Sequence, residues 1–475
     1  MRAWGLRMPL PEASLLLLLA TLGHALATEP EAVTAAEPAV TAASDPFAVH
    51  ARVVTLDNGL RVVVERIDRT DELALHLHVG VGSRDEEPGQ YGLAHLFEHL
   101  MFEGSEHARG NAYDTLVTGA GGENNAFTTE DETAYHVVAP SGALERLLFL
   151  ESDRLGFLSA GVTEEAVKNQ IDVVIQEREQ GYAAVHGKDY DVLQQMVYPQ
   201  GHPYHRPVIG TVDDVEAFTV DKARAFHRRY YQPSNVVLGV VGNIDLDHAI
   251  ERTAWWFSDV PDQGPVARID PEDLPRHGTT QRGILADNVD DTTVYLSWDG
   301  AAINDPDEAA LVVASFILSD GRGTRIDRHY YKKGWITDSD ARSWSQELDG
   351  QFLVSLTSDK PKPKPLERIL RKEVAKLASK PPSEAELDRA RRKIRGLLLD
   401  SLERPADRVE VLVDCVRLDG DPDCTRTDWA RIQAVTPADV SAAIARLGEP
   451  AAMLIVAPTS DAPALDEGMS YVEPM

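Results

Sequence analysis

The second half of the sequence repeats the first at a constant spacing, and this repeat constrains the fold more than any other feature. Residues 215–241 align without gaps on residues 432–458, an offset of 217 positions, with identities at Ala217/Ala434, Thr219/Thr436, Ala225/Ala442, Arg229/Arg446 and Pro233/Pro450. The same offset places Gly104 on Gly321 and residues 77–81 on residues 294–298. Because one register serves three separate segments, we predict two similar domains that arose by duplication.

Residues 91–104 carry the most specific motif of the chain, H-x-x-E-H, on a predicted helix. Apolar residues recur at helical spacing along one face: Leu93, Leu96, Phe97 and Leu100. His95 and His99 are four residues apart, so they lie one above the other on a second face. Two such imidazoles can bind one Zn²⁺, and the neighbouring Glu98 can take a proton from the metal-bound water. With 15 histidines in the chain, the motif favours metal chemistry but leaves a chance match open.

Glu177 is the candidate third ligand. A helix is predicted from Thr163 onward, and one stripe of it contains Ala166, Gln170, Val173 and Glu177. A carboxylate on such a face is costly unless it is paired or binds a metal. The alternative is a partly exposed glutamate near the helix end, beside Arg178.

Composition limits the class of function. The 475 residues carry a formal net charge of −30, which argues against nucleic-acid binding because no basic field collects phosphate. A hydrophobic content of 43% is that of a soluble globular protein. The charge fits either cationic peptide substrates or a solvated acidic surface.

The N-terminus predicts export. Residues 1–27 read as a signal peptide, with Arg2 and Arg7, an apolar run at 15–19 and a small-x-small cleavage site at 25–27. That run is too short to span a bilayer, and no other stretch reaches the required length. We therefore expect a soluble, periplasmic or secreted protein. In such a compartment Cys415 and Cys424 form a disulfide or stay as two free thiols.

The remaining chain divides into predicted segments. A disordered leader covers 28–45, the metal-bearing domain 46–262, a Pro/Asp/Gly-rich linker 263–283, the second domain 284–460 and a loose tail 461–475. A hairpin is predicted around Asp57-Asn58-Gly59, and a half-buried strand over 73–81 places His76 and His78 on one face. That face is solvated, covered by a helix or, less simply, metal-binding. Under the repeat, His95, Glu98 and His99 fall on Val312, Ser315 and Phe316, so the second domain lacks the metal site.

Together these motifs resemble the pitrilysin–insulinase family of inverted-motif zinc peptidases, specifically the bacterial half-length relatives of mitochondrial processing peptidase. The resemblance rests on H-x-x-E-H at 95–99, GENNAFT at 122–128, VVIQE at 173–177, HPYHRPVIG at 202–210 and YYQPSN at 230–235. It implies two similar α+β domains, each a mixed sheet packed with helices, that form half of a clamshell.

The resemblance also implies roles for individual residues. His95, His99 and Glu177 match the ligands of one zinc ion, and Glu98 matches the general base. Asn125, Ala126 and Phe127 match a strand that binds extended peptide substrates; an ordinary sheet edge is the alternative reading of these residues. The implied activity is zinc-dependent hydrolysis of peptides.

Two positions depart from the family pattern. Family members often have a glutamate seven residues before the third ligand, where this chain has Gln170. Active members also use an Arg/Tyr pair in the second domain, where this chain has Tyr330 and Thr337. The sequence therefore predicts the zinc-bearing subunit of a heterodimer whose metal-less partner supplies the pair. The alternative is a non-catalytic peptide-binding or assembly subunit with a structural zinc.

Overall fold

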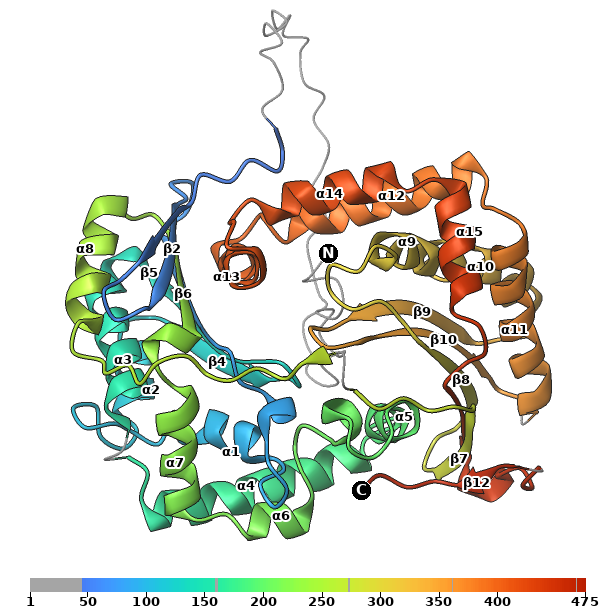
Figure 1. Cartoon of the computed structure of the whole chain (residues 1–475), viewed down its shortest axis with the longest axis horizontal. Helices are drawn as coiled ribbons and strands as arrows, with labels where there is room; N and C mark the ends of the chain where they lie inside the picture. Colours follow the sequence, from blue (N-terminus) through green and yellow to red (C-terminus); the bar gives the residue numbers. More distant parts are fainter. Residues whose placement is uncertain (1–44, 159–160, 272–273, 361, 467) are drawn as a thin grey trace, which may run out of the picture.

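The computed structural model describes residues 45–475 except 159–160, 272–273, 361 and 467. The predicted signal peptide, 1–27, and the predicted leader as far as residue 44 lie outside the described residues. Two mixed six-stranded sheets, each packed with helices, organise the described chain (Figure 1). This α+β architecture with two similar halves confirms the predicted fold class.

The first sheet has the strand order β1-β2-β6-β3-β5-β4. Its strands are β1 (Arg52–Thr55), β2 (Arg61–Arg66), β3 (Glu72–Val79), β4 (Glu123–Thr128), β5 (Thr133–Pro140) and β6 (Val236–Gly242). β2 pairs with β6 in parallel, and the other neighbours are antiparallel. The predicted hairpin joins β1 to β2, with Gly59 at a φ of +88° that favours glycine. β4 is left at one edge of this sheet.

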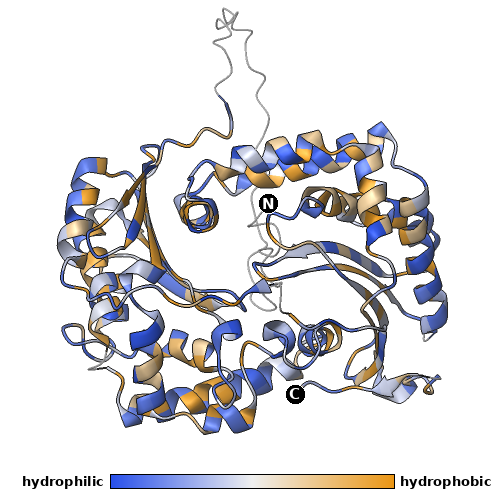
Figure 2. Cartoon of the chain, in the orientation of Figure 1, coloured by the Kyte–Doolittle hydropathy of each residue, from blue (hydrophilic) through white to orange (hydrophobic). Residues whose placement is uncertain are grey.

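The helices of the same half gather on one face of the first sheet, some packing on the strands and others on neighbouring helices. These are α1 (Leu93–Leu100), α2 (Ala112–Gly119), α3 (Leu144–Gly156), α4 (Glu164–Ala183), α6 (Val212–Glu216), α7 (Val220–Tyr230) and α8 (Leu246–Phe257). Leu75 and Leu77 of β3 share a buried cluster with Leu96 and Phe97 of α1. Figure 2 shows apolar residues concentrated along the strands, with polar residues along the outer turns of the helices. Burial of this stripe fixes which face of α1 is turned away from the sheet.

The second sheet has the order β12-β7-β11-β8-β10-β9. Its strands are β7 (Gln281–Asp287), β8 (Thr292–Asp299), β9 (Asp338–Ser345), β10 (Gly350–Ser358), β11 (Ala452–Pro458) and β12 (Ser470–Tyr471). Its helices are α9 (Glu308–Leu318), α10 (Arg325–His329), α11 (Pro363–Ser379), α12 (Glu384–Asp400), α14 (Cys424–Ala434) and α15 (Pro437–Arg446). α9, β9, β10 and α15 follow in the same succession as α1, β4, β5 and α7, in keeping with the repeat.

The two halves exchange one helix each (Figure 1). α13 (Pro405–Asp419) belongs to the second half but packs on β3 and β6, where Val409, Leu412 and Val413 are fully buried against the first sheet. α5 (Asp189–Val197) belongs to the first half but shares a buried cluster with β7 and β11. Each sheet is thus covered on its second face by a helix of the other half, and the halves are packed as one unit.

The exchange explains the environment of His76 and His78. Both lie on β3, are 1% exposed and face α13, so their face of the sheet is covered by a helix. Gly239 of β6 permits this contact, because a Cβ there would meet Val409 Cγ2 at 2.5 Å and Val413 Cγ2 at 2.6 Å. Cys415 at the other side of α13 forms a disulfide with Cys424 of α14, which decides between the two predicted states of these cysteines.

Two segments differ from the predicted boundaries. β7 begins at Gln281, inside the predicted linker 263–283, because its backbone pairs with β11. The tail 461–475 is not loose throughout, since Ser470 and Tyr471 pair with Gly283 and Ile284 of β7. An open sheet edge accepts any extended segment of suitable length, so hydrophobic periodicity does not reveal such a pairing. Among the described helices, none combines the length and apolarity needed to cross a bilayer.

Candidate metal centre

α1 and α4 bring the three predicted ligands together. α1 begins after Gly92, whose φ of +94° and close contact with Ile209 leave no room for a side chain. Its residues Leu93, Leu96, Phe97 and Leu100 are buried, as predicted. His95 and His99 lie on another face, and α4 runs past them with Glu177. The repeated apolar spacing of α1 therefore determines where the imidazoles point.

The spacing of the three side chains fits one metal ion. His99 Nε2 lies 3.4 Å and His95 Nε2 3.8 Å from Glu177 Oε2, and one ligand atom from each residue lies within 4.8 Å of the others. Ligands about 2.0–2.1 Å from a tetrahedral zinc ion lie about 3.4 Å apart. The two nitrogen–oxygen distances are long for hydrogen bonds and suit groups that converge on a common cation. Two imidazoles and a carboxylate are also the ligand types of catalytic zinc sites.

Electrostatics differ between the two histidines. Burial lowers the pKa of His95 to about 4, although the negative charge of Glu177 acts to raise it. Burial also acts to lower the pKa of His99, but the contact with Glu177 and the charges of Glu98 and Glu177 outweigh it, so the pKa of His99 is raised. The same contact with His99 lowers the pKa of Glu177, whose side chain is 51% exposed. Glu177 is therefore held as a carboxylate that faces the two rings.

Glu98 lies beside this group without being part of it. Its Oε2 accepts a hydrogen bond of 2.7 Å from Thr128 Oγ1, at the end of β4. Burial raises the pKa of Glu98 to about 7, although the Thr128 hydrogen bond and His99 act in the other direction. A carboxyl group with a pKa near neutrality can both accept and return a proton. Thr128 closes the GENNAFT motif, but its contact with Glu98 was not predicted from the sequence.

A second contact of His99 involves two further residues. His99 Nδ1 lies 3.2 Å from Gln170 Oε1, and Gln170 Nε2 lies 2.5 Å from Glu103 Oε1. Gln170 occupies the position where the family resemblance implies a glutamate, whereas no role of Glu103 was predicted from the sequence. The only signal for Glu103 was its place four residues after His99, directly behind the helix.

The predicted substrate residues lie on the edge strand β4. Asn125, Ala126 and Phe127 pair with His136, Tyr135 and Ala134 of β5, and no strand pairs with the other side of β4 among the described residues. Asn125 is exposed, while Ala126 and Phe127 are half-buried. β4 ends at Thr128, so its free edge leads directly to Glu98.

The second half carries no equivalent site at the matching positions. Val312, Ser315 and Phe316 of α9 offer no metal ligand apart from the Ser315 hydroxyl, which donates to Val312 O. Tyr330 and Thr337, at the positions where the resemblance implies an Arg/Tyr pair, have internal partners: Tyr330 Oη donates to Glu373, and Thr337 Oγ1 donates to Asp291. Both side chains are therefore hydrogen-bonded within the second half.

A second group of potential ligands is buried between the halves. His78, Glu132 and Asp414 place one ligand atom each within 4.8 Å of the others. Arg417 lies 3.4 Å from Glu132 and 3.6 Å from Asp414, so a guanidinium already supplies the positive charge there. This group therefore fits a buried ion network better than a metal site.

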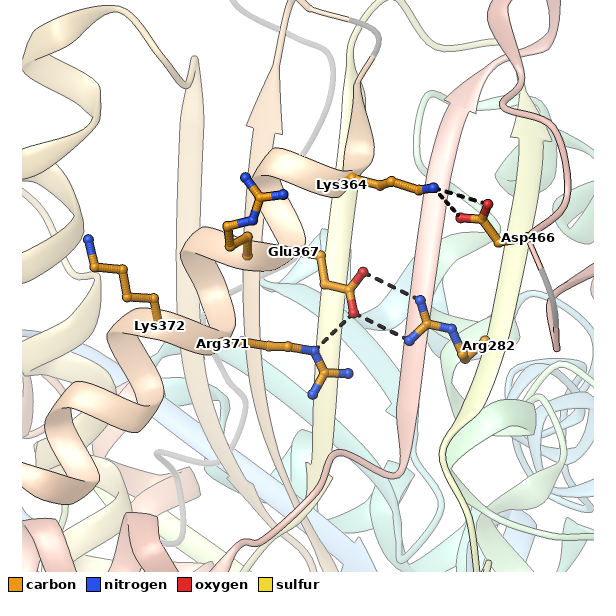
Figure 3. Close-up of a pocket in the computed structure, with 7 residues that line it drawn as sticks. Arg282, Lys364, Glu367, Arg371, Lys372 and Asp466 are labelled. Carbon is orange, nitrogen blue, oxygen red and sulfur yellow. Dashed lines mark hydrogen bonds and ion pairs between the residues drawn. The ribbon is translucent and has the colours of Figure 1, made fainter.

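A cavity of about 560 Å³ lies on the second half (Figure 3). Its lining residues are distant in the sequence from the H-x-x-E-H motif at 95–99. Figure 3 shows its charges largely paired with one another: Glu367 faces Arg282 and Arg371, and Lys364 faces Asp466. None of the predicted site residues lines it, so it is not the candidate centre.

Comparison with known proteins identifies relatives of this chain. Residues 61–210 match the family described as insulinase (peptidase family M16), and residues 217–394 match the peptidase M16 inactive domain. The zinc protease PqqE of Helicobacter pylori is 27% identical over 369 residues, which cover 76% of this chain and 82% of that protein.

Two solved structures show the same fold. The crystal structure of a protease from Helicobacter pylori has a TM-score of 0.79 at 23% identity, covering 86% of this chain and 99% of that chain. The periplasmic protease PqqL from Escherichia coli has a TM-score of 0.70 at 20% identity, covering 87% of this chain and 48% of that chain. With both domain models matched in order and zinc proteases among its relatives, the chain belongs to the M16 (insulinase/pitrilysin) family of zinc proteases.

Proposed function

We propose that this chain is the zinc-bearing subunit of an endopeptidase that hydrolyses peptides or unfolded segments. The observation that carries the proposal is the convergence of His95, His99 and Glu177 from two helices, with the buried Glu98 beside them. Each chain would hold one zinc ion through these three ligands, which leaves a coordination position open.

The chemistry divides between the metal and the protein. When bound, zinc supplies Lewis acidity, which lowers the pKa of the attacking water and polarises the scissile carbonyl. Glu98 accepts the proton of that water and returns it to the leaving amine. The hydrogen bond from Thr128 to Oε2 orients the carboxylate and leaves Oε1 for proton transfer. A raised pKa near 7 supports this role at neutral pH.

The free edge of β4 is the proposed substrate platform. An extended peptide that adds to this edge would form backbone hydrogen bonds with β4 along Asn125–Phe127. Because β4 ends at Thr128, which contacts Glu98, such a peptide would pass the base. Main-chain pairing suits unfolded substrates, since a folded protein rarely offers a free strand.

We further propose that a metal-less homologous subunit completes the active site. Tyr330 and Thr337 have internal partners, so this chain does not present an Arg/Tyr pair at those positions. The chain spans 48% of PqqL, and the rest of PqqL has no counterpart in this match. The periplasmic location of PqqL, the disulfide and the predicted signal peptide support export to the periplasm, with secretion as the alternative.

The rival function is a non-catalytic assembly subunit with a structural zinc. The hydrogen bonds of Tyr330 to Glu373 and of Thr337 to Asp291 favour this rival, because these side chains do not point to a substrate. Against it stands Glu98, because a structural site needs no buried carboxyl group held beside its ligands by a threonine.

Turnover of an internally quenched unfolded peptide tests the proposal. The mature chain is assayed alone and with a co-expressed homologue that carries the Arg/Tyr pair. We expect one zinc per chain, cleavage with the partner, and a loss of about 100-fold or more in kcat/KM for Glu98→Gln with zinc retained. Equal turnover by Glu98→Gln would refute the role of the base, and full turnover by the chain alone would refute the need for a partner.

A further inference from the structure

His99 uses its two ring nitrogens for different partners. Nε2 faces Glu177 at 3.4 Å, while Nδ1 lies 3.2 Å from Gln170 Oε1, and Gln170 Nε2 lies 2.5 Å from Glu103 Oε1. We propose that Glu103 is a positioning residue that acts through Gln170 to fix the metal-binding tautomer of His99. This inference rests on the proposed function and deepens it, because it assigns the groups that prepare a ligand for zinc.

The direction of each hydrogen bond follows from Glu103. An ionised carboxylate only accepts hydrogen bonds, so the amide NH₂ of Gln170 must face Glu103. The amide oxygen then faces His99, and an oxygen accepts only from a protonated Nδ1. A neutral imidazole protonated at Nδ1 carries its lone pair at Nε2, which is the nitrogen that faces Glu177. One carboxylate thus determines which nitrogen can bind a metal.

The same two helices that supply the ligands supply this chain of contacts. Gln170 lies on α4 seven residues before Glu177, so both side chains share one face of the helix. Glu103 lies in the turn directly after α1. Gly104 fixes that turn, because it has a φ of +106° and a Cβ there would meet Gly110 N at 2.4 Å. The backbone of α1, α4 and the turn at Gly104 therefore positions Glu103 and Gln170 as well as His99.

His95 has no comparable support. Its Nδ1 is buried and has no hydrogen-bond partner among the residues that the structure describes. Of the two imidazoles, only that of His99 therefore has a hydrogen bond at Nδ1 among the described residues that can set its tautomer. Removing an outer partner of a metal-binding histidine typically lowers metal affinity by about 10–100-fold.

Zinc affinity of the full mature chain, measured by competition with a chromophoric chelator, tests the proposal without a peptidase assay. Glu103→Ala should weaken zinc binding by about 10–100-fold, while the melting temperature of the metal-free protein stays near that of the wild type. Glu103→Gln preserves size but no longer dictates the amide direction, so a smaller loss is expected. Glu106→Ala, which removes an exposed carboxylate three residues on, is the matched control and should bind like the wild type.

A charge swap tests the direction of the contacts. In Glu103→Gln/Gln170→Glu the new carboxylate accepts directly from His99 Nδ1 and receives the amide NH₂ of residue 103, so most of the lost affinity should return. A purely structural role of Glu103 would not produce this rescue.

Wild-type affinity in Glu103→Ala, or a swap that binds no better than Glu103→Ala, would overturn the inference while the zinc proposal stands. A wild-type chain that binds no zinc would overturn both.

Discussion

Replacing Arg408 by methionine should destabilise the whole chain, because Arg408 joins the exchanged helix α13 to the first sheet. Its Nε and Nη2 donate to the two carboxylate oxygens of Glu65 on β2, at 2.5 and 2.7 Å. It also donates to the carbonyl oxygens of Leu402 and Ala48. Glu65 is 2% exposed, so the variant leaves a carboxylate in the interior, where the backbone N–H of His50 still donates to it.

The expected magnitude follows from that environment. Removing one partner of a buried ion pair costs about 3–5 kcal/mol, chiefly because the remaining charge is buried without compensation. Two carbonyl oxygens also lose a donor, which favours the upper end of the range. Arg404→Met is the matched control on the same segment, since Arg404 pairs with Asp407 at 2.7 Å but is 73% exposed. An exposed pair of this kind contributes about 0–1 kcal/mol.

Urea unfolding of the two variants and of Arg408→Met/Glu65→Gln measures the effect. The double variant replaces the buried carboxylate by a neutral amide, so it should regain part of the free energy of unfolding lost in Arg408→Met. If Arg408→Met were as mild as Arg404→Met, the ion pair would not hold α13 to the first sheet.

Three further outcomes are expected. Burial lowers the pKa of His227 to about 4, below its unfolded value near 6.5. Between these two pH values the unfolded chain binds more protons than the folded chain, so the free energy of unfolding falls as the pH drops from about 6.5 to about 4. His227→Gln should make this pH dependence shallower in urea titrations, and an unchanged pH dependence contradicts the assignment. Gly239→Ala should lower the free energy of unfolding by about 1–3 kcal/mol, because its Cβ would strike Val409 and Val413. Gly119→Ala, which has open space around it, is the control and should leave the stability unchanged. Equal urea midpoints for the two variants would exclude the tight contact. Glu177→Ala should lower zinc affinity by about 100-fold or more in chelator competition, while undiminished binding would remove Glu177 from the ligand set.

Local periodicity was sufficient to predict much of the fold. The apolar spacing of Leu93, Leu96, Phe97 and Leu100 predicted the buried face of α1. The alternation over 73–81 predicted the strand β3, although β3 is buried on both faces and not half-buried. The repeat predicted two similar halves, which the two six-stranded sheets confirm. Each of these signals is carried by residues that are close in the sequence or related by one register.

The exchange of α5 and α13 could not be predicted in the same way. Val409, Leu412 and Val413 mark α13 as a helix with a buried face, but a sheet of either half could cover that face equally well. The choice depends on long-range details such as Gly239, which removes a side chain where α13 approaches β6. The strand pairing of Ser470 and Tyr471 has the same origin, since backbone edges carry no sequence pattern.

Only those residues of the candidate centre that belong to a sequence motif could be predicted. The sequence selected His95, Glu98, His99 and Glu177, and the structure brings them together. Thr128 contacts Glu98 from 30 positions away in the sequence, and Glu103 contacts Gln170 from 67 positions away, so neither contact could be predicted from local spacing. Contacts of this kind require the relative placement of β4, α1 and α4.

Anomalous diffraction at the zinc absorption edge, from crystals of the mature chain, tests the central claim most directly. The account predicts one peak about 2.0–2.1 Å from Nε2 of His95, Nε2 of His99 and a carboxylate oxygen of Glu177. A peak at His78, Glu132 and Asp414 instead, or zinc held by the histidines with Glu177 turned away, would contradict it.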